Sequence, residues 1–365
     1  MRIIDSHAHV FPSLGESAGF ASVEEHLATL QWAVRQHVQP TLRKRDNSRV
    51  TEPTLIRLPC TGRSSLTDVG FRVGKYGRVE WVANGDEMFL QYMPPLLADM
   101  TAPPELLLAM MEHAGVSTVV LHNDSIYGKL NDLFSSCVAR WPDRFIALAN
   151  VDVAPNNRDA QCATLDKALD EQGHRGLFFK MDDFFMHDFA EDPFGPEYRP
   201  FWDHVAARKI PVYWQVIGVP VPSMENTLRI WQGFVRWLAA YPEVPVVLVG
   251  GLPWEFAGRE KIPDFVRQAL HEYPVLIEIV YPIQKGGPFR YPFAECREAA
   301  RFLYEEYGPE RVVWGSDAPN VERYCTYRQS HEYLDTYEFL SDEDRRLILG
   351  GNLERLFGLD ANTAG

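Results

Sequence analysis

The chain of 365 residues is 46% hydrophobic and 24% charged, which is typical of a protein that buries a large core and excludes disordered and fibrous classes. Its formal net charge of −14 argues against nucleic acid or an anionic membrane as a partner, because phosphate binding needs a basic surface. No apolar run reaches the ~18 residues that a membrane span requires, and the N-terminus lacks the pattern of a signal peptide. The five cysteines are scattered and form no C-x-x-C pair, as in a reducing compartment. We therefore expect one soluble, cytoplasmic domain over residues 1–365.

Short apolar runs rich in β-branched residues recur along the chain, each followed by a longer segment of helical periodicity. This alternation indicates βαβ units and a parallel sheet. Eight runs are expected to be strands: 2–6, 118–121, 145–150, 176–181, 211–215, 245–249, 275–279 and 311–315. Because eight strand-helix repeats in one domain favour closure, the predicted fold is an α/β protein with a single (β/α)₈ TIM-type barrel.

A long insertion of roughly a hundred residues separates the first strand from a helix expected near Pro103, too many for a plain connection. Within it, Val23–Gln39 has the pattern of a helix and Gly70–Ala83 that of a β-hairpin. The segment 13–100 leaves the carboxyl end of the first strand, so we expect a lid over the barrel mouth or a subunit interface, with a decorative insertion as the alternative. An interface is favoured by five aromatic residues that would form an apolar patch if exposed: Phe71, Tyr76, Trp81, Phe89 and Tyr92.

The sequence Asp5-Ser6-His7-Ala8-His9 lies at the end of the first expected strand. Alternate residues of a strand point to the same side, so His7 and His9 can present two imidazoles to one metal ion. An isolated H-x-H is otherwise explained by two hydrogen-bonded histidines. Barrel active sites lie at the carboxyl ends of strands, and this position favours the metal ligands.

A second polar motif, Trp314-Gly315-Ser316-Asp317-Ala318-Pro319, ends the eighth expected strand. The first and last strands of a closed barrel are neighbours, so Asp317 can reach an ion held by His7 and His9. A carboxylate there can ligate the metal and also take a proton from metal-bound water, whose pKa the ion lowers. Capping of the following turn is the alternative for Asp317 alone. We predict His7, His9 and Asp317 as metal ligands and Asp317 as the catalytic residue.

Together these motifs resemble the amidohydrolase-related metal enzymes, a family that includes aminocarboxymuconate semialdehyde decarboxylase and the resorcylate-type decarboxylases. The resemblance spans nearly the whole chain. Its motifs occur in the expected order: Asp5–His9, Tyr127-Gly128 with Asn131, Pro142–Phe145, Gly315–Asp317, Gly351-Asn352 and Leu356–Gly358. It implies a metal-bearing barrel that performs hydrolysis or non-oxidative decarboxylation.

The chain departs from this family at two positions. The family usually has a metal-binding His at the end of strand five and a catalytic His at the end of strand six. Here the first position is Gln215, and the second lies in the run Val247–Gly251, which contains no His. A Gln carbonyl oxygen is a neutral and weaker ligand than imidazole for a borderline metal. Because Gln215 terminates its strand, we expect it to face the metal or the substrate.

Further candidates at the barrel mouth are Lys180, Glu278 and His122, which we expect to bind substrate. A lysine near a metal can be tuned by burial, but it can also simply pair with a carboxylate. Glu278 in strand seven is one such carboxylate across the barrel. His122 after strand two is a polar loop residue in the alternative interpretation.

Three functions are compatible with these residues. The first is a metal-dependent hydrolase or non-oxidative decarboxylase, a lyase, acting on a small carboxylated compound, with zinc as the expected metal and iron or manganese as alternatives. The second is a subunit of a metal-dependent oxygenase, similar to the two-subunit 2-aminoisobutyrate hydroxylase. The third is a non-catalytic partner of a catalytic paralogue. A homo-oligomer, or a hetero-oligomer with a related chain, is expected in each case.

Overall fold

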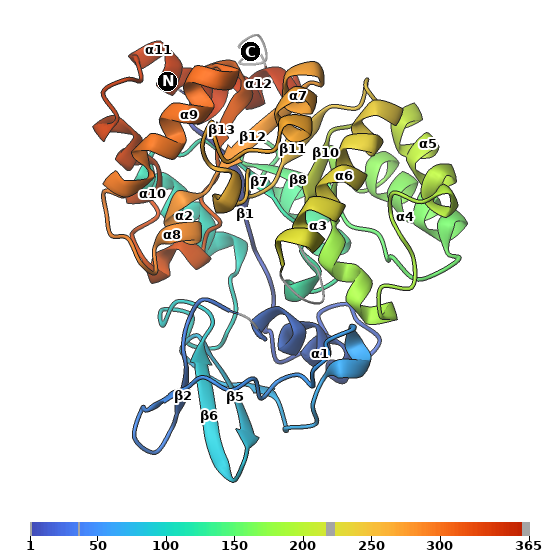
Figure 1. Cartoon of the computed structure of the whole chain (residues 1–365), viewed down its shortest axis with the longest axis vertical. Coiled ribbons are helices and arrows are strands. Elements are labelled where there is room, and N and C mark those ends of the chain that lie inside the picture. Colours follow the sequence, from blue (N-terminus) through green and yellow to red (C-terminus); the bar gives the residue numbers. More distant parts are fainter. Residues whose placement is uncertain (1, 36, 217–222, 360–365) are drawn as a thin grey trace.

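The computed structural model describes residues 2–35, 37–216 and 223–359. Eight parallel strands form one sheet in chain order (Figure 1). They are β1 (Ile4–Ala8), β7 (Thr118–Leu121), β8 (Phe145–Ala149), β9 (Gly176–Lys180), β10 (Val212–Gln215), β11 (Val246–Leu248), β12 (Val275–Ile279) and β13 (Val312–Trp314). The sheet closes because His9 N donates to Ala318 O at 2.8 Å and Asp317 N donates to His7 O at 2.7 Å. The predicted TIM-type barrel is confirmed.

Helices cover the outside of the barrel. The longer ones are α2 (Pro104–Ala114), α3 (Asn131–Arg140), α4 (Arg158–Asp170), α5 (Arg199–Arg208), α6 (Met224–Ala240), α7 (Asp264–Glu272) and α9 (Arg297–Tyr307). Shorter ones are α8 (Tyr281–Lys285), α10 (Gln329–Glu332), α11 (Asp342–Arg346) and α12 (Asn352–Phe357). In α6, Ser223 caps the N-terminus, and Ile230, Phe234 and Trp237 recur at helical spacing on the face buried against the strands.

The inside of the barrel is filled at the amino ends of the strands. A compact cluster there consists of Ile4, Val120, Ile146, Leu148, Phe178, Tyr213, Val247, Val249 and Val313, closed by Leu353 and Phe357 of α12. Side chains two residues further along a strand point to the same side, one layer nearer the carboxyl end. His122, Lys180 and Gln215 follow Val120, Phe178 and Tyr213 by two residues. The packing therefore leaves the carboxyl ends of the strands for a polar layer.

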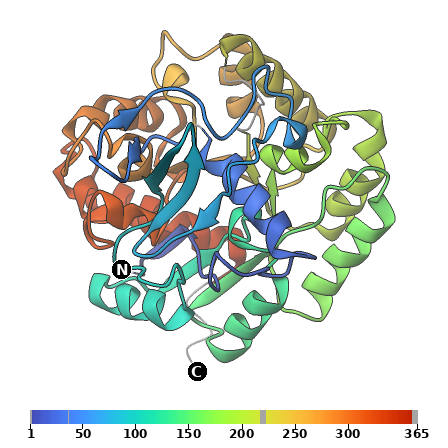
Figure 2. The same cartoon turned by 90° about the horizontal axis from the view of Figure 1, so that it is seen from below.

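The insertion folds as a small unit of its own (Figures 1 and 2). Its antiparallel sheet has the order β3-β2-β6-β5-β4. The bounds are β2 (Thr41–Arg43), β3 (Arg49–Val50), β4 (Arg72–Val73), β5 (Arg78–Ala83) and β6 (Asp86–Gln91), with α1 (Val23–Val34) beside them. Figure 2, which looks from below, shows this unit in front of the ring of barrel helices.

Details of the insertion differ from the sequence expectation. The predicted hairpin is present as β4 and β5, which pair Val73 with Val79. A third strand, β6, was not predicted. It follows a tight turn at Asn84 and Gly85, whose φ angles of 53° and 79° are those of a type I′ hairpin turn. Helix α1 ends at Val34, earlier than predicted, and residue 36 lies outside the described part of the chain.

The aromatic residues of the insertion do not form the expected exposed patch. Only Tyr76 is exposed, at 60%, whereas Phe71, Trp81, Phe89 and Tyr92 are buried. The insertion is large enough to enclose them between its own sheet and the barrel. Trp81, for example, is fully buried and donates from Nε1 to Thr54 Oγ1 at 2.9 Å. Their number therefore gives no support for a subunit interface.

All five cysteines are free in the structure. Among the described residues, no helix is both long and apolar enough to span a membrane.

Candidate metal centre

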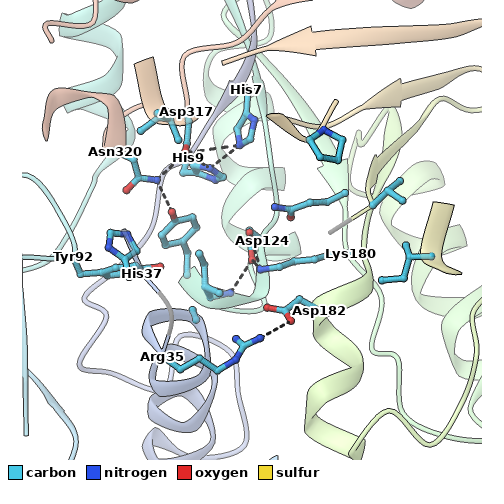
Figure 3. Close-up of a pocket in the computed structure, with 18 of the residues that line it drawn as sticks. His7, His9, Arg35, His37, Tyr92, Asp124, Lys180, Asp182, Asp317 and Asn320 are labelled. Atoms are coloured by element: carbon cyan, nitrogen blue, oxygen red, sulfur yellow. Dashed lines mark hydrogen bonds and ion pairs between the residues drawn. The ribbon is translucent and has the colours of Figure 1, made fainter. Parts of the chain in front are cut away.

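A cavity of about 710 Å³ opens at the carboxyl ends of the barrel strands (Figure 3). Its floor contains His7, His9 and Asp317, from β1 and from the loop after β13. The insertion contributes to the opposite wall through Ala33, Arg35, His37 and Tyr92. The cavity is thus bounded by both the barrel and the insertion.

The structure brings together the three side chains that were predicted as metal ligands. His7 Nε2 lies 3.1 Å from His9 Nε2, which lies 3.0 Å from Asp317 Oδ1. The third side, from His7 Nε2 to Asp317 Oδ1, is 3.8 Å. Two nitrogen ligands about 2.05 Å from a tetrahedral ion stand roughly 3.3 Å apart, so this triangle has the size of a metal-ligand set.

The far nitrogens of both imidazoles are engaged elsewhere. His7 Nδ1 lies 2.9 Å from Glu278 Oε2, and His9 Nδ1 lies 3.1 Å from the carbonyl oxygen of His122. Both acceptors require the proton on Nδ1, which turns the two Nε2 lone pairs toward each other and toward Asp317. Two lone pairs and a carboxylate in contact repel unless a proton or a metal ion lies among them. The donor set therefore fits a metal ion.

Neighbouring charges shift the pKa values of His7 and Asp317. Burial alone would lower the pKa of His7, but the Glu278 carboxylate, with Asp317, raises it to about 9. Burial would raise the pKa of Asp317, but the hydrogen bond from His9 and the charges of both imidazoles hold it below its usual value. The backbone of Asp317 has a φ of 58°, a strained conformation for a residue other than glycine. It is held by the bond from Asp317 N to His7 O.

Glu278 lies beneath His7 and does not line the cavity. Its Oε1 accepts from Ser6 Oγ at 2.7 Å, and its Oε2 accepts from His7 Nδ1 and from Gly250 N at 2.8 Å. A Cβ at Gly315 would stand 2.8 Å from His7 Cβ and 2.9 Å from Glu278 Oε1. Glycine is needed there because any side chain would push the carboxylate and the imidazole apart.

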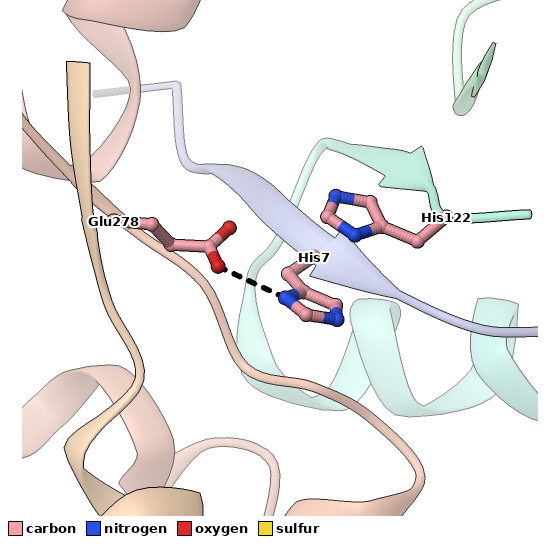
Figure 4. A group of neighbouring side chains, drawn as sticks. All are labelled: His7, His122 and Glu278. Carbon is pink, nitrogen blue, oxygen red and sulfur yellow. Dashed lines mark hydrogen bonds and ion pairs between the residues drawn. The ribbon is translucent and has the colours of Figure 1, made fainter. Parts of the chain in front are cut away.

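His122 lies beside His7 (Figure 4) and is not among the residues that line the cavity. Its ring stacks on His7 at 3.9 Å, and its Nε2 donates to Ser6 O at 2.8 Å. Burial, with the neighbouring imidazoles, holds the pKa of His122 well below its usual value, so the ring is neutral. His7, His122 and Glu278 could also surround an ion, but the Glu278 carboxylate already accepts three hydrogen bonds. His122 and Glu278 thus contact His7 and are not among the residues that line the cavity, and the substrate-binding role predicted for them stays a prediction.

Lys180 and Gln215 do line the cavity. Lys180 Nζ lies 3.0 Å and 3.2 Å from the two oxygens of Asp124, so its partner is not Glu278. Burial would lower the pKa of Lys180, but Asp124 and the neighbouring aspartates raise it above its usual value, and the lysine stays charged. Gln215 Oε1 is buried and has no hydrogen-bond partner among the described residues.

At the end of β11, the sixth barrel strand, the family's usual histidine is absent, and two glycines stand there. Gly250 and Gly251 follow β11 with φ angles of 71° and 66°, and Gly250 N donates to Glu278. A different imidazole, His37 of the insertion, lines the cavity. Burial, together with the charge of Arg323, lowers the pKa of His37 to about 3, so it is neutral.

Sequence reasoning did not identify Asn320 as part of the site. Its Nδ2 donates to Asp317 Oδ1 and to Tyr127 Oη, both at 2.7 Å (Figure 3). Asn320 begins the 3₁₀ turn Asn320–Arg323 that follows the last strand. The available signal was its position only three residues after Asp317, in the same loop.

Comparisons with known proteins agree with this geometry. The model of a family described as amidohydrolase matches residues 4–359. A 2,6-dihydroxybenzoate decarboxylase from Rhizobium is 18% identical, with a TM-score of 0.56 over 72% of this chain and 90% of that one. A probable 2-pyrone-4,6-dicarboxylic acid hydrolase from Acinetobacter baumannii is 16% identical, with a TM-score of 0.56 over 98% of this chain and 100% of that one.

A third solved structure contains a metal. It is a dihydroxybenzoic acid decarboxylase from Polaromonas sp. JS666 with bound manganese and an inhibitor, 2-nitroresorcinol. It is 17% identical, with a TM-score of 0.51 over 71% of this chain and 87% of that one. At these identities the structural matches establish the shared fold. No curated protein matches the chain significantly.

Proposed function

Because the chain belongs to the amidohydrolase family, we propose that it is a metal-dependent enzyme that hydrolyses or non-oxidatively decarboxylates a small carboxylated compound. The observation that carries the proposal is the convergence of His7 Nε2, His9 Nε2 and Asp317 Oδ1, with both Nδ1 atoms already hydrogen-bonded. A divalent ion would take the place of the protons shared among these three atoms, since imidazole nitrogens and a carboxylate oxygen are metal ligands.

His7, His9 and Asp317 are the proposed metal ligands. A divalent ion bound by them supplies a Lewis acid that polarises a substrate oxygen or lowers the pKa of bound water. Zinc is our first proposal, because two imidazoles and a carboxylate suit it, with manganese or iron as alternatives. The manganese bound by the Polaromonas relative supports keeping that alternative.

Asp317 is the proposed proton carrier. It touches both ligand imidazoles, and Asn320 fixes its Oδ1 from the other side. No imidazole follows β11, and Lys180 remains charged against Asp124, so neither position supplies a neutral base. In this scheme Gln215 accepts a hydrogen bond from the substrate through its buried, unpartnered Oε1.

The insertion 13–100 is the proposed lid. Trp32 Nε1 donates to Asp182 Oδ1 at 2.9 Å, which connects α1 to the segment after β9. Gln39 Nε2 donates to Tyr324 Oη at 3.1 Å on the other side of the mouth. Anchored at both sides, the insertion would exclude bulk water from the cavity and strengthen its electrostatic interactions.

A second candidate is favoured by the absence of imidazoles at the ends of β10 and β11. In it, the chain is a subunit of an oxygenase or a non-catalytic partner, and a related chain associates with it. A cytoplasmic location and oligomerisation stay predictions in both cases.

The first test is metal content and turnover. Purified protein would be analysed for metals, then stripped and reloaded with zinc, manganese or iron. Absorbance changes of 2,6-dihydroxybenzoate and 2-pyrone-4,6-dicarboxylate, the compounds named for two relatives, would follow turnover. We expect metal-dependent loss of one of them in wild type and none in Asp317→Asn. A fully metal-loaded protein that transforms neither compound and consumes oxygen with a related chain would favour the second candidate.

A further inference from the structure

Three side chains extend from the metal centre along one face of the chain. Asp317, Asn320 and Arg323 are three residues apart, and all line the cavity. The last two belong to one 3₁₀ turn, in which residues three apart eclipse each other. Arg323 is therefore the continuation of the Asp317–Asn320 row toward the insertion, where its Nη1 donates to the carbonyl oxygen of Tyr92.

The other cations of the cavity have acidic partners. Lys180 lies 3.0 Å from Asp124, and Arg35 lies 3.7 Å from Asp182 (Figure 3). By contrast, no carboxylate oxygen of the described residues lies within 4.0 Å of the Arg323 guanidinium. The positive charge of Arg323 is consequently the one that the described part of the cavity leaves without a carboxylate.

The hydrogen bonds of Arg323 are also incomplete. Its Nε is buried and has no hydrogen-bond partner among the described residues. A buried, unpartnered N–H of a charged group costs free energy until an acceptor reaches it. The nearby imidazole of His37 cannot balance this charge, because it is neutral or positively charged in either protonation state. With Nη1 used by Tyr92, the edge formed by Nε and Nη2 is the one that carboxylates bind with two parallel hydrogen bonds.

We propose that Arg323 is a specificity-determining residue that binds a carboxylate of the substrate, separate from the group that reacts at His7, His9 and Asp317. The substrate class is then a small molecule with a carboxylate at one end and the scissile group at the other, such as a dicarboxylate. This inference rests on the proposed function only for the end of the substrate that reacts at His7, His9 and Asp317. The carboxylate contact itself does not depend on the type of reaction.

The competing explanation is that Arg323 only fastens the insertion through Tyr92. Its neighbour Tyr324 provides the matched control, since its hydroxyl accepts from Gln39 and also fastens the insertion, but carries no charge. Tyr324→Phe therefore removes a fastening contact and leaves the cation. Arg323→Lys keeps the positive charge but loses the pair of parallel N–H donors, and Arg323→Gln removes the charge.

The experiment is calorimetric titration of the full, metal-loaded chain with benzene-1,3-dicarboxylate, with 3-carbamoylbenzoate, which has the same shape and one charge fewer, and with benzoate. We expect wild type and Tyr324→Phe to prefer the dicarboxylate by about ten- to hundredfold, the range of a charged hydrogen-bonded pair. Arg323→Gln should lose this preference and keep its affinity for benzoate, and Arg323→Lys should be intermediate.

Three results would overturn the proposal: no preference in wild type, a preference retained in Arg323→Gln, or equal loss for all three ligands in both Arg323→Gln and Tyr324→Phe. The last result, with faster proteolysis of the insertion, would assign Arg323 to fastening. Because binding needs no turnover, a protein that binds the dicarboxylate through Arg323 and catalyses neither reaction would remove the proposed function and leave this inference in place.

Discussion

On one side of the barrel mouth, formed by β1 and β13, each imidazole nitrogen of His7 and His9 has a partner, and Asp317 is held by Asn320 and by the ligand histidines. On the opposite side, formed by β10 and β11, Gln215 presents an unpartnered oxygen, and two glycines occupy the next strand end. The first side is organised before any ligand arrives. The second is left for the ligand to complete.

This difference separates two tasks that metal enzymes often combine. The β1 and β13 side would hold the proposed ion, because its hydrogen bonds fix each proposed ligand atom. The β10 and β11 side adds no imidazole and so supplies neither a further strong ligand nor a second base. Metal binding should depend mainly on the β1 and β13 side, whereas substitutions on the β10 and β11 side should change the metal affinity only moderately.

The largest expected effect is removal of the imidazoles on the organised side. The double variant His7→Ala, His9→Ala should lose its bound metal, since Asp317 alone is a weak site. Elemental analysis of purified protein measures this. His37→Ala, which removes another cavity imidazole, is the control and should keep its metal. Equal metal content in the double variant and wild type would show that the ion, if any, is bound elsewhere.

A smaller loss of metal affinity is expected when a hydrogen-bond partner of a proposed ligand is removed and the ligand itself is kept. Glu278→Gln should weaken metal binding by about ten- to hundredfold, the usual effect of removing such a partner, because His7 Nδ1–H loses its carboxylate acceptor. Competition with a chelator gives the affinity. Ser6→Ala, which removes only the hydrogen bond to Glu278 Oε1, should change it less. If both variants bind metal as wild type does, the organisation of the β1 side has no bearing on affinity.

The β10 and β11 side is tested by a substitution that should increase metal affinity. Gln215→His should tighten metal binding by about tenfold, because imidazole is a better ligand for a borderline metal than a neutral amide oxygen. The same chelator series applies, with Gln215→Met as a control of similar size. An affinity unchanged in Gln215→His would mean that this side chain serves the substrate and does not reach the ion.

The smallest effect concerns pH, at Asp183 near the Lys180–Asp124 pair. Burial, with the charge of Asp124 acting against that of Lys180, raises the pKa of Asp183 to about 7. A carboxyl with a raised folded-state pKa favours folding below its unfolded value and loses that contribution as pH rises through 7. Asp183→Asn should therefore gain stability relative to wild type between pH 5 and pH 8, on the order of 1 kcal/mol.

Melting temperatures of the two proteins across this range would show the change. Ser125 Oγ donates to Asp183 Oδ1 and so lowers the pKa of Asp183. Ser125→Ala controls for loss of that hydrogen bond, because it should keep the pH dependence that Asp183→Asn loses. Parallel curves for wild type and Asp183→Asn would mean that Asp183 is ionised throughout.

Much of the site follows from periodicity. Two-residue spacing places His7 and His9 together, and barrel closure brings Asp317 beside them, so their convergence could be predicted from the motifs. The same spacing directs Lys180, Gln215 and Glu278 inward. The metal and catalytic roles of these residues stay predictions.

The sequence does not predict how deep a side chain lies in the barrel or which residue it pairs with. Whether an inward residue lines the cavity or lies beneath it depends on how far its strand is staggered along the barrel, so the position of Glu278 and His122 outside the cavity lining could not be predicted. Lys180 pairs with Asp124, from a neighbouring loop, and not with the carboxylate across the barrel. The burial of Trp81 depends on a sheet whose outer strands, β3 and β4, are each only two residues long and have little sequence pattern.

The closure of the barrel between β1 and the loop after β13 also sets when the site can exist. His7 and His9 are synthesised before Asp317 and before the α12 residues that close the barrel floor. No partial chain that lacks the last strand contains the complete triangle. If these three residues bind the ion as we propose, the complete site forms only after strand β1 and the loop after β13 have come together.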